Sequence, residues 1–141
     1  AGTPGLVNSK RAKKMYAASL VNARASAEVI VRDSPEEVFF VETGVCPDGR
    51  GDEDRACAEY IESLVIGDPK PLDEVISRVR NSINGKRLLS EKSESFPKED
   101  IEWICTPNRF DWAMRAERID GSMVRLTRKD LFPEIQKGAR T

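Results

Sequence analysis

The residues best suited to chemistry lie between Gly44 and Asp54, in the sequence GVCPDGRGDED. Glycines in such a loop let the backbone approach a ligand closely, and Arg50 offers a planar pair of donors that suits a phosphate or sulfonate. A helix beginning near Asp52 would add its free N–H groups as further donors for an anion. A carboxylate of the same run could hold Mg²⁺. The loop therefore predicts a site for a small anion.

Two familiar phosphate-binding motifs come close to this loop without matching it. The spacing G-x-x-x-x-G-R-G resembles a nucleotide-binding P-loop with Arg50 at the lysine position, but Gly51 stands where the Mg-binding Ser or Thr would be. Cys46 lies too close to Arg50 for the loop of the cysteine phosphatases. A purely structural explanation stays open, because the acidic run 52–54 suits the first turn of any helix and Arg50 would then only pair with it.

Two further junctions between a loop and a helix carry polar residues. Asn22 and Arg24 stand at the start of a helix expected over residues 23–32, and Gly2 and Thr3 precede another near the N-terminus. Arg24 is either a second anion ligand or a surface residue on a capped helix. Ligands of parallel α/β sheets bind beyond the carboxyl ends of the strands, so we expect the three junctions to meet at one pocket.

The elements that position these residues are expected to alternate between strand and helix. Short apolar runs predict buried strands, and amphipathic spacing predicts helices. The expected strands cover residues 15–21, 38–43 and 101–105; the expected helices cover 4–12, 23–32, 52 to the break at 67–71, and 72 to a stop at 84–85. Asp120-Gly121 predicts an antiparallel hairpin between residues 113–119 and 122–127. The predicted fold is a layered α/β/α domain with a mainly parallel sheet and this hairpin near the C-terminus.

We expect residues 1–128 to form a single α/β domain, the C-terminal part of a larger fold, and residues 129–141 to form a peripheral tail. Because the chain opens with Ala1, it reads as a fragment, a processed product or an isolated domain. Other candidate residues are weaker. Cys57 and Cys105 lie in apolar patterns and are expected in the core, the aromatic residues Trp103, Phe110 and Trp112 are expected in packing or at an interface, and Asp111 is a weak site candidate near a strand end.

Composition excludes several classes of function. The chain has no histidine, which removes Ser-His-Asp and Cys-His catalysis and the Cys/His zinc sites. Lys and Arg (23) nearly balance Asp and Glu (24), so no overall field favours nucleic acid or an anionic membrane. No apolar run is long enough for a membrane span. Three cysteines without a framework spacing predict free thiols and a cytoplasmic location.

Three segments together resemble the 2-phosphosulfolactate phosphatase family, over most of residues 1–128. They are AGT at residues 1–3, SLVNA at 19–23, and the run in which Gly49-Arg50, Glu53-Asp54 and Cys57-Ala58 match a Gly-Arg, Glu-Asp, Cys-Ala motif. The last match is the most specific of the three. The chain departs from the family in having Ala1 for Asn and Glu59 for Gly, and in a loop shorter by about a residue. The family's N-terminal half, with its Asp-x-x-Arg-Ala segment, has no counterpart here.

The resemblance implies an Mg²⁺-dependent phosphatase of the kind used in coenzyme M biosynthesis, acting on a small phosphorylated acidic metabolite. It implies catalytic roles for Arg50, Glu53 and Asp54, with Glu53 or Asp54 holding the metal. The implied substrate-binding residues are Gly2, Thr3, Asn22, Arg24 and Gly49. Dimerisation, or association with the missing N-terminal half, would complete the fold. The alternatives are a non-catalytic anion-binding or interaction domain that retains the fold and, more distantly, a P-loop-like nucleotide binder.

Overall fold

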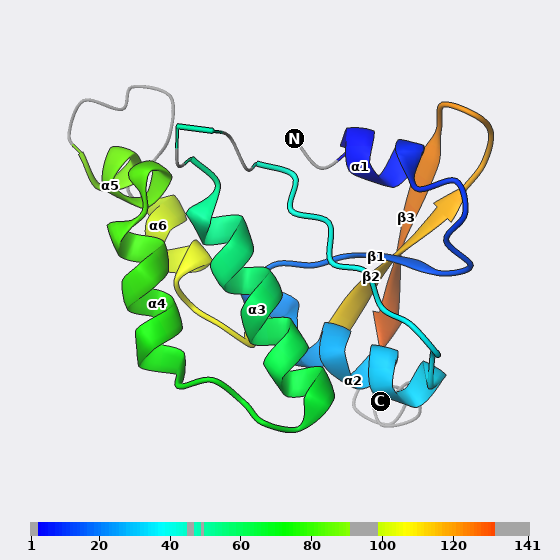
Figure 1. Cartoon of the computed structure of the whole chain (residues 1–141), viewed down its shortest axis with the longest axis horizontal. Coiled ribbons are helices and arrows are strands. Elements are labelled where there is room, and N and C mark those ends of the chain that lie inside the picture. The colour runs from blue at the N-terminus through cyan, green and yellow to red at the C-terminus, as the bar shows by residue number, and fades with distance from the viewer. Residues whose placement is uncertain (1–2, 45–46, 49, 91–98, 132–141) are drawn as a thin grey trace, which may run out of the picture.

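The computed structural model describes residues 3–44, 47–48, 50–90 and 99–131, and these form a mixed domain of helices and strands (Figure 1). The α/β class predicted from the sequence is therefore confirmed. The elements in chain order are α1 (Thr3–Asn8), β1 (Met15–Ala17), the 3₁₀-helix η1 (Leu20–Asn22), α2 (Ala23–Asp33), α3 (Asp52–Ile66), α4 (Leu72–Asn81), α5 (Ile83–Leu89), α6 (Glu99–Ile104), β2 (Trp112–Arg118) and β3 (Val124–Asp130).

The strands form a three-stranded sheet in the order β1-β2-β3. Both strand pairs are antiparallel, with Tyr16 opposite Arg115 and Arg115 opposite Thr127. The predicted hairpin is confirmed. Asp120 closes its turn, because one of its carboxylate oxygens accepts hydrogen bonds from the N–H groups of Ser122 and Met123 at 2.8 and 2.9 Å. The mainly parallel sheet predicted from the sequence is not found in the described residues, where every strand pair is antiparallel.

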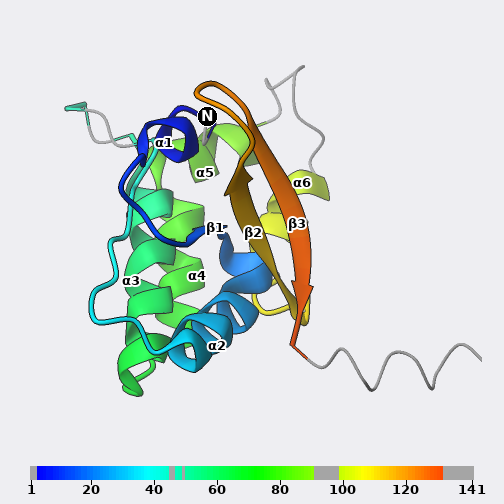
Figure 2. The same cartoon turned by 90° about the vertical axis from the view of Figure 1, so that its right-hand side faces the viewer.

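Helices α2, α3 and α4 lie side by side, and their facing apolar residues form the main core (Figure 1). Val29 of α2, on a different face of that helix, packs with Ala113 of β2 and with Leu131, which follows β3. Figure 2 shows the helical layer on one side of the hairpin, with β3 at the opposite margin of the molecule. β3 ends at Asp130, within residues 129–141 that were predicted to form a peripheral tail, and Leu131 is buried.

The helices α2 and α3 confirm the amphipathic patterns that predicted them. α2 ends at Asp33, one residue beyond the prediction, where Ser34 takes a left-handed conformation and donates its N–H to the carbonyl of Val31. α3 begins at Asp52 and ends before Gly67, as predicted. These two helices carry the polar residues on which the predicted site depends.

Two of the predicted strands are wrong. Residues 38–43 form no strand, although burial alternates along them: Val38 and Phe40 pack against the core, whereas Phe39 and Val41 are exposed. The segment is extended but has no strand beside it among the described residues. Residues 101–104 belong to α6, and Cys105 follows its end. A short apolar run does not distinguish strand from helix by itself.

Three predicted boundaries also change. The helix expected to stop at Asn84-Gly85 ends at Asn81, and α5 begins at once because the hydroxyl of Ser82 accepts a hydrogen bond from the N–H of Gly85 at 2.9 Å. The first strand ends at Ala17 and the chain turns into η1. α1 ends at Asn8, short of the expected residue 12. No helix in the described part of the chain is long and apolar enough to cross a membrane.

Candidate functional site

The start of α3 carries the acidic run that the sequence singled out. Gly51 precedes the helix with a φ of 93°, a left-handed conformation that glycine adopts without strain, and its carbonyl accepts hydrogen bonds from the N–H groups of Asp54 and Arg55. Three carboxylates in the first turn match the positive end of the helix dipole. The local sequence therefore accounts for a helix that begins at Asp52.

Asp54 faces back toward the preceding loop and contacts the backbone of Gly44. The Gly44 N–H donates a hydrogen bond to the Asp54 carboxylate, and a methyl group built on Gly44 would come within 2.6 Å of its Oδ2 atom. Burial raises the pKa of Asp54, and the nearby charges of Glu53 and Glu42 raise it further. Asp54 is thus a partly buried carboxylate among like charges, an environment typical of groups that bind a cation or exchange a proton.

Glu53 points in a different direction, toward α5. Its Oε1 atom accepts a short hydrogen bond from the side-chain amide of Asn84, whereas its Oε2 atom is buried and has no hydrogen-bond partner among the described residues. A buried carboxylate oxygen without a partner is costly, and it is the kind of atom that a cation or a water would satisfy. The sequence predicted only that Asn84 helps to end a helix, and it did not predict this contact with Glu53.

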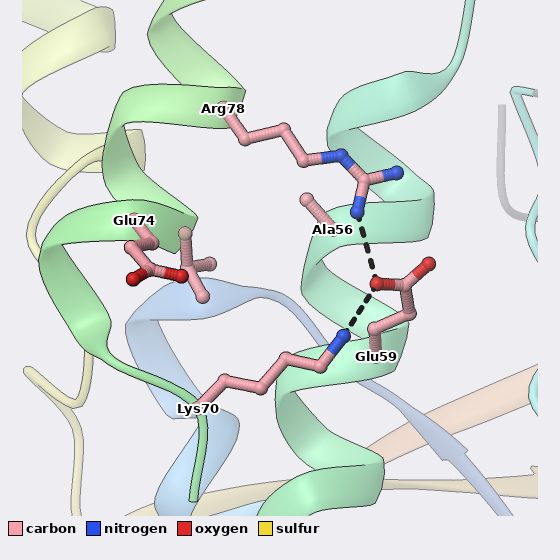
Figure 3. A pocket seen from close by; sticks show the side chains of 6 residues that line it. Ala56, Glu59, Lys70, Glu74 and Arg78 are labelled. Atoms are coloured by element: carbon pink, nitrogen blue, oxygen red, sulfur yellow. Dashed lines mark hydrogen bonds and ion pairs between the residues drawn. The ribbon is translucent and has the colours of Figure 1, made fainter.

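The third acidic residue of the turn, Asp52, belongs to a different network. Its carboxylate binds the guanidinium of Arg78 on α4, whose Nη1 also contacts Glu59 at 2.9 Å. Glu59 accepts a further bond from Lys70 at 2.7 Å. Glu59, Lys70 and Arg78 line a pocket of about 110 Å³ between α3 and α4 (Figure 3). Both cations are paired with carboxylates, so the pocket offers no unpaired positive charge. The ion pairs of Arg78 connect α3 to α4.

Arg50, the predicted phosphate ligand, is bound within its own loop. Its Nε atom donates to Asp48 at 2.8 Å, and its backbone N–H donates to the other oxygen of the same carboxylate at 3.2 Å. These bonds, with the backbone bond contributing most, lower the pKa of Asp48. Arg50 is exposed at the end of the loop that leads into α3. An anion at this junction would compete with Asp48 for the Nε atom of Arg50.

A second arginine at the same junction was not predicted. Arg55 donates from Nε to the Glu42 carboxylate at 3.1 Å, and this pair connects α3 to the segment that precedes Gly44. Glu42 also contributes to the raised pKa of Asp54. The sequence signal for Glu42 was its position immediately before Thr43-Gly44, at the edge of the predicted loop.

Asn22 and Arg24, at the start of α2, make contacts that stabilise the fold. Asn22 is buried, and its Oδ1 atom accepts the N–H of Ser19 at 2.9 Å. Arg24 donates from its guanidinium to Asp111 at 3.2 Å, and its backbone N–H donates to Asn108 at 2.9 Å. In the described part of the chain, Asn22 and Arg24 share no contact partner with Glu53 or Asp54. The polar residues at the start of α2 are therefore not joined to Glu53 or Asp54 by a shared hydrogen-bond partner among the described residues.

The N-terminal junction does adjoin the start of α3. Gly5 of α1 lies against Thr43, whose Cγ2 would be 3.1 Å from a methyl group on that glycine, and Gly44 follows directly. Arg118 of β2 holds the end of α1 through the carbonyl of Val7 at 2.8 Å. Thr3 lies within α1. The predicted ligands Gly2 and Gly49 lie outside the described residues.

The carboxylates at the start of α3 fit one mode of Mg²⁺ binding. No group of three or more Asp, Glu, Cys or His side chains among the described residues is arranged to enclose a metal ion. Mg²⁺, however, is commonly held by one or two carboxylates together with water and phosphate oxygens. Asp54, with its raised pKa, and Glu53, with a buried unpartnered oxygen, are the two that suit this mode.

Among curated proteins, the chain is similar to a probable 2-phosphosulfolactate phosphatase from Bacillus subtilis (strain 168), with 24% identity over 128 residues. The match covers 90% of this chain and 55% of that protein, so the chain spans about half the length of the relative. No protein-family model matches the chain, and no solved structure matches it significantly. The relative makes the family plausible and supports a phosphatase-like function at family level.

Proposed function

We propose that the chain is a phosphatase-like domain that uses Mg²⁺ to hydrolyse a small acidic phosphoester, with 2-phosphosulfolactate as the first candidate substrate. The observation that carries this proposal is the pair of neighbouring carboxylates at the start of α3: Asp54 with a raised pKa and Glu53 with a buried, unpartnered oxygen. The distant phosphatase relative supplies the reaction class.

In this proposal Asp54 or Glu53 holds Mg²⁺, which would neutralise charge on the phosphoryl oxygens. Asp54 is positioned by the Gly44 N–H and Glu53 by the Asn84 amide, so both carboxylates are fixed before a ligand arrives. Such preorganisation is what electrostatic stabilisation of a transition state requires. Arg50 would bind the phosphate oxygens in place of Asp48. Arg24, on the separate junction, is proposed to matter less for turnover.

The test is phosphate release from 2-phosphosulfolactate by the 141-residue chain, with a generic aryl phosphate measured alongside. The proposal predicts release in Mg²⁺ that EDTA abolishes and that an excess of Mg²⁺ restores. Release that is equal in Mg²⁺ and EDTA would contradict the metal-dependent mechanism. Absence of release from both substrates would contradict turnover by this chain.

A non-catalytic anion-binding or interaction domain is the second candidate, and one observation weighs against the phosphatase. Both arginines predicted to bind anions are already paired, Arg50 with Asp48 and Arg24 with Asp111. Isothermal titration with inorganic phosphate separates the two functions. Binding of phosphate without release of phosphate from either ester would support the binding domain.

A further inference from the structure

An extended segment of the chain, residues 36–43 with the sequence EEVFFVET, lies on the surface with no strand beside it. None of its backbone groups makes a backbone hydrogen bond to any described residue. Phe39 is 78% exposed and Val41 is 62% exposed, while Val38 and Phe40 pack inward. Large apolar side chains exposed in this way on an extended, unpaired backbone indicate a surface that is completed by another strand.

The sheet offers a matching surface at its β3 edge. Among the described residues β3 pairs only with β2, and no other described strand pairs with the outer side of its seven residues, Val124–Asp130. Leu126 on this strand is 48% exposed, and Met123, just before it, is 57% exposed. An exposed edge strand with apolar side chains is a template for the addition of another strand.

The charges of the two surfaces are complementary. Residues 36–43 contain Glu36, Glu37 and Glu42, with no cation. β3 contains three cations and a single acid. Two of the cations, Arg125 and Lys129, are exposed, and the charge of Lys129 also helps to lower the pKa of Asp33. Two copies of β3 placed edge to edge would bring like charges together, which disfavours self-pairing of that strand. An acidic, apolar, extended segment is the partner that suits it.

The two surfaces lie on opposite sides of the molecule. In Figure 2 the segment, drawn in cyan, follows the margin beside α3, and β3 lies toward the opposite margin, where α6 is also seen. The segment therefore cannot reach β3 of its own chain without leaving the core. We propose that residues 36–43 of one copy of the chain add as a fourth strand to the β3 edge of a second copy, giving head-to-tail association. Such a heterologous contact continues from copy to copy unless a ring closes.

Two aspartate substitutions test the proposal, each removing one surface. Phe39→Asp inactivates the segment and leaves β3 intact, whereas Leu126→Asp inactivates β3 and leaves the segment intact. In sedimentation velocity, the unsubstituted chain is expected to form concentration-dependent species larger than a dimer. Each variant alone should be monomeric, and an equimolar mixture of the two should form a 1:1 dimer that does not grow. Ile66→Asp is the matched control: Ile66 is 70% exposed and lies on neither surface, so this variant should associate normally.

A charge exchange tests the same contact in a second way. Arg125→Glu with Lys129→Glu should weaken association about tenfold or more, since the basic edge becomes acidic and repels the acidic segment. Glu36→Lys with Glu37→Lys should do the same, and the chain carrying all four changes should recover association. Circular dichroism confirms that each variant is folded. A monomeric unsubstituted chain at high concentration, an equal loss in Ile66→Asp, or a mixture of Phe39→Asp and Leu126→Asp that stays monomeric would overturn the proposal.

Discussion

The Oδ2 atom of Asp54 lies so close to the Cα of Gly44 that a methyl group there would approach it to 2.6 Å. Glycine at position 44 therefore allows the loop to touch the first turn of α3. We expect Gly44→Ala to lower the free energy of unfolding by about 1–3 kcal/mol through this overpacking. Urea denaturation measures the change.

The matched control for that substitution is Gly121→Ala, since a methyl group on Gly121 would meet no atom within 4 Å. In a double-mutant cycle, Gly44→Ala should cost less when Asp54 is also alanine, because the carboxylate that clashes is gone. An equal cost in both backgrounds would show that this contact is not the cause.

Glu53→Gln should lower the pKa of Asp54, because the charge of Glu53 is one of the causes that raise it. Burial is the largest cause, so the pKa should not return fully to its ordinary value. Carboxyl NMR titration of Asp54 measures the shift. Glu62→Gln, an exposed residue farther along α3, is the control and should leave the pKa of Asp54 unchanged.

The same raised pKa sets a pH dependence of stability. Folded protein holds the Asp54 proton more tightly than unfolded protein does, so stability from this group is full below the unfolded value and is lost as the pH rises through the folded value. Glu53→Gln should reduce that loss. A variant whose stability falls with pH as steeply as that of the unsubstituted chain would argue against coupling of the two carboxylates.

Asp33 should show the opposite pH dependence. Lys14 contributes most to lowering its pKa, and Tyr16 donates a hydrogen bond to it at 2.6 Å. The stability that these contacts provide is present above the unfolded pKa of about 3.8 and is lost as the pH falls through the lower folded value. Asp33→Asn should therefore cost about 1–2 kcal/mol at pH 7, and the cost should shrink in acid. Denaturation at pH 7 and in acid, with Asp68→Asn as the surface control, measures this difference.

Arg78 connects α3 to α4 through Asp52 and Glu59. Arg78→Met keeps much of the apolar stem and removes the charge, which leaves Asp52 without its cation while Glu59 keeps its bond to Lys70. We expect a loss of about 1–2 kcal/mol for this partly exposed network, measured by thermal unfolding at low salt. Arg80→Met, an exposed arginine on the same helix, should change stability little. A loss of the same size in Arg80→Met would contradict the role of the network.

The sequence predicted the features of this fold that are encoded locally. The turn at Asp120-Gly121 and the helices α2 and α3 depend on side chains within a few residues of one another, and all were confirmed. The strand expected at residues 38–43 shows the right alternation of burial but has no pairing strand among the described residues. Strand pairing depends on distant residues, so alternation alone did not establish it.

The candidate site was predictable to a similar degree. The acidic first turn of α3 was evident from the sequence, but its three carboxylates diverge, with Asp52 bound to α4, Glu53 bound to α5 and Asp54 facing Gly44. No periodicity could reveal this, because each partner is distant in the sequence or lies across a loop. The partner of Arg24 could not be predicted for the same reason. Asp111 is distant from Arg24 in the sequence and follows α6.

Asp48→Asn tests the part played by Arg50. With its ion pair weakened, the guanidinium is freer to bind an anion, so affinity for inorganic phosphate should rise by about threefold to tenfold. Isothermal titration measures the change. Affinity that falls or does not move would show that Arg50 is not a phosphate ligand.

The most direct test of the central claim compares two aspartates in the assay of phosphate release from 2-phosphosulfolactate with Mg²⁺. The account predicts that Asp54→Asn lowers kcat/KM by about a hundredfold or more, as expected when a ligand that positions the metal is removed. Asp111→Asn, at the partner of Arg24, should retain most of the activity. Full activity in Asp54→Asn, or an equal loss in both variants, would contradict a metal site at the start of α3.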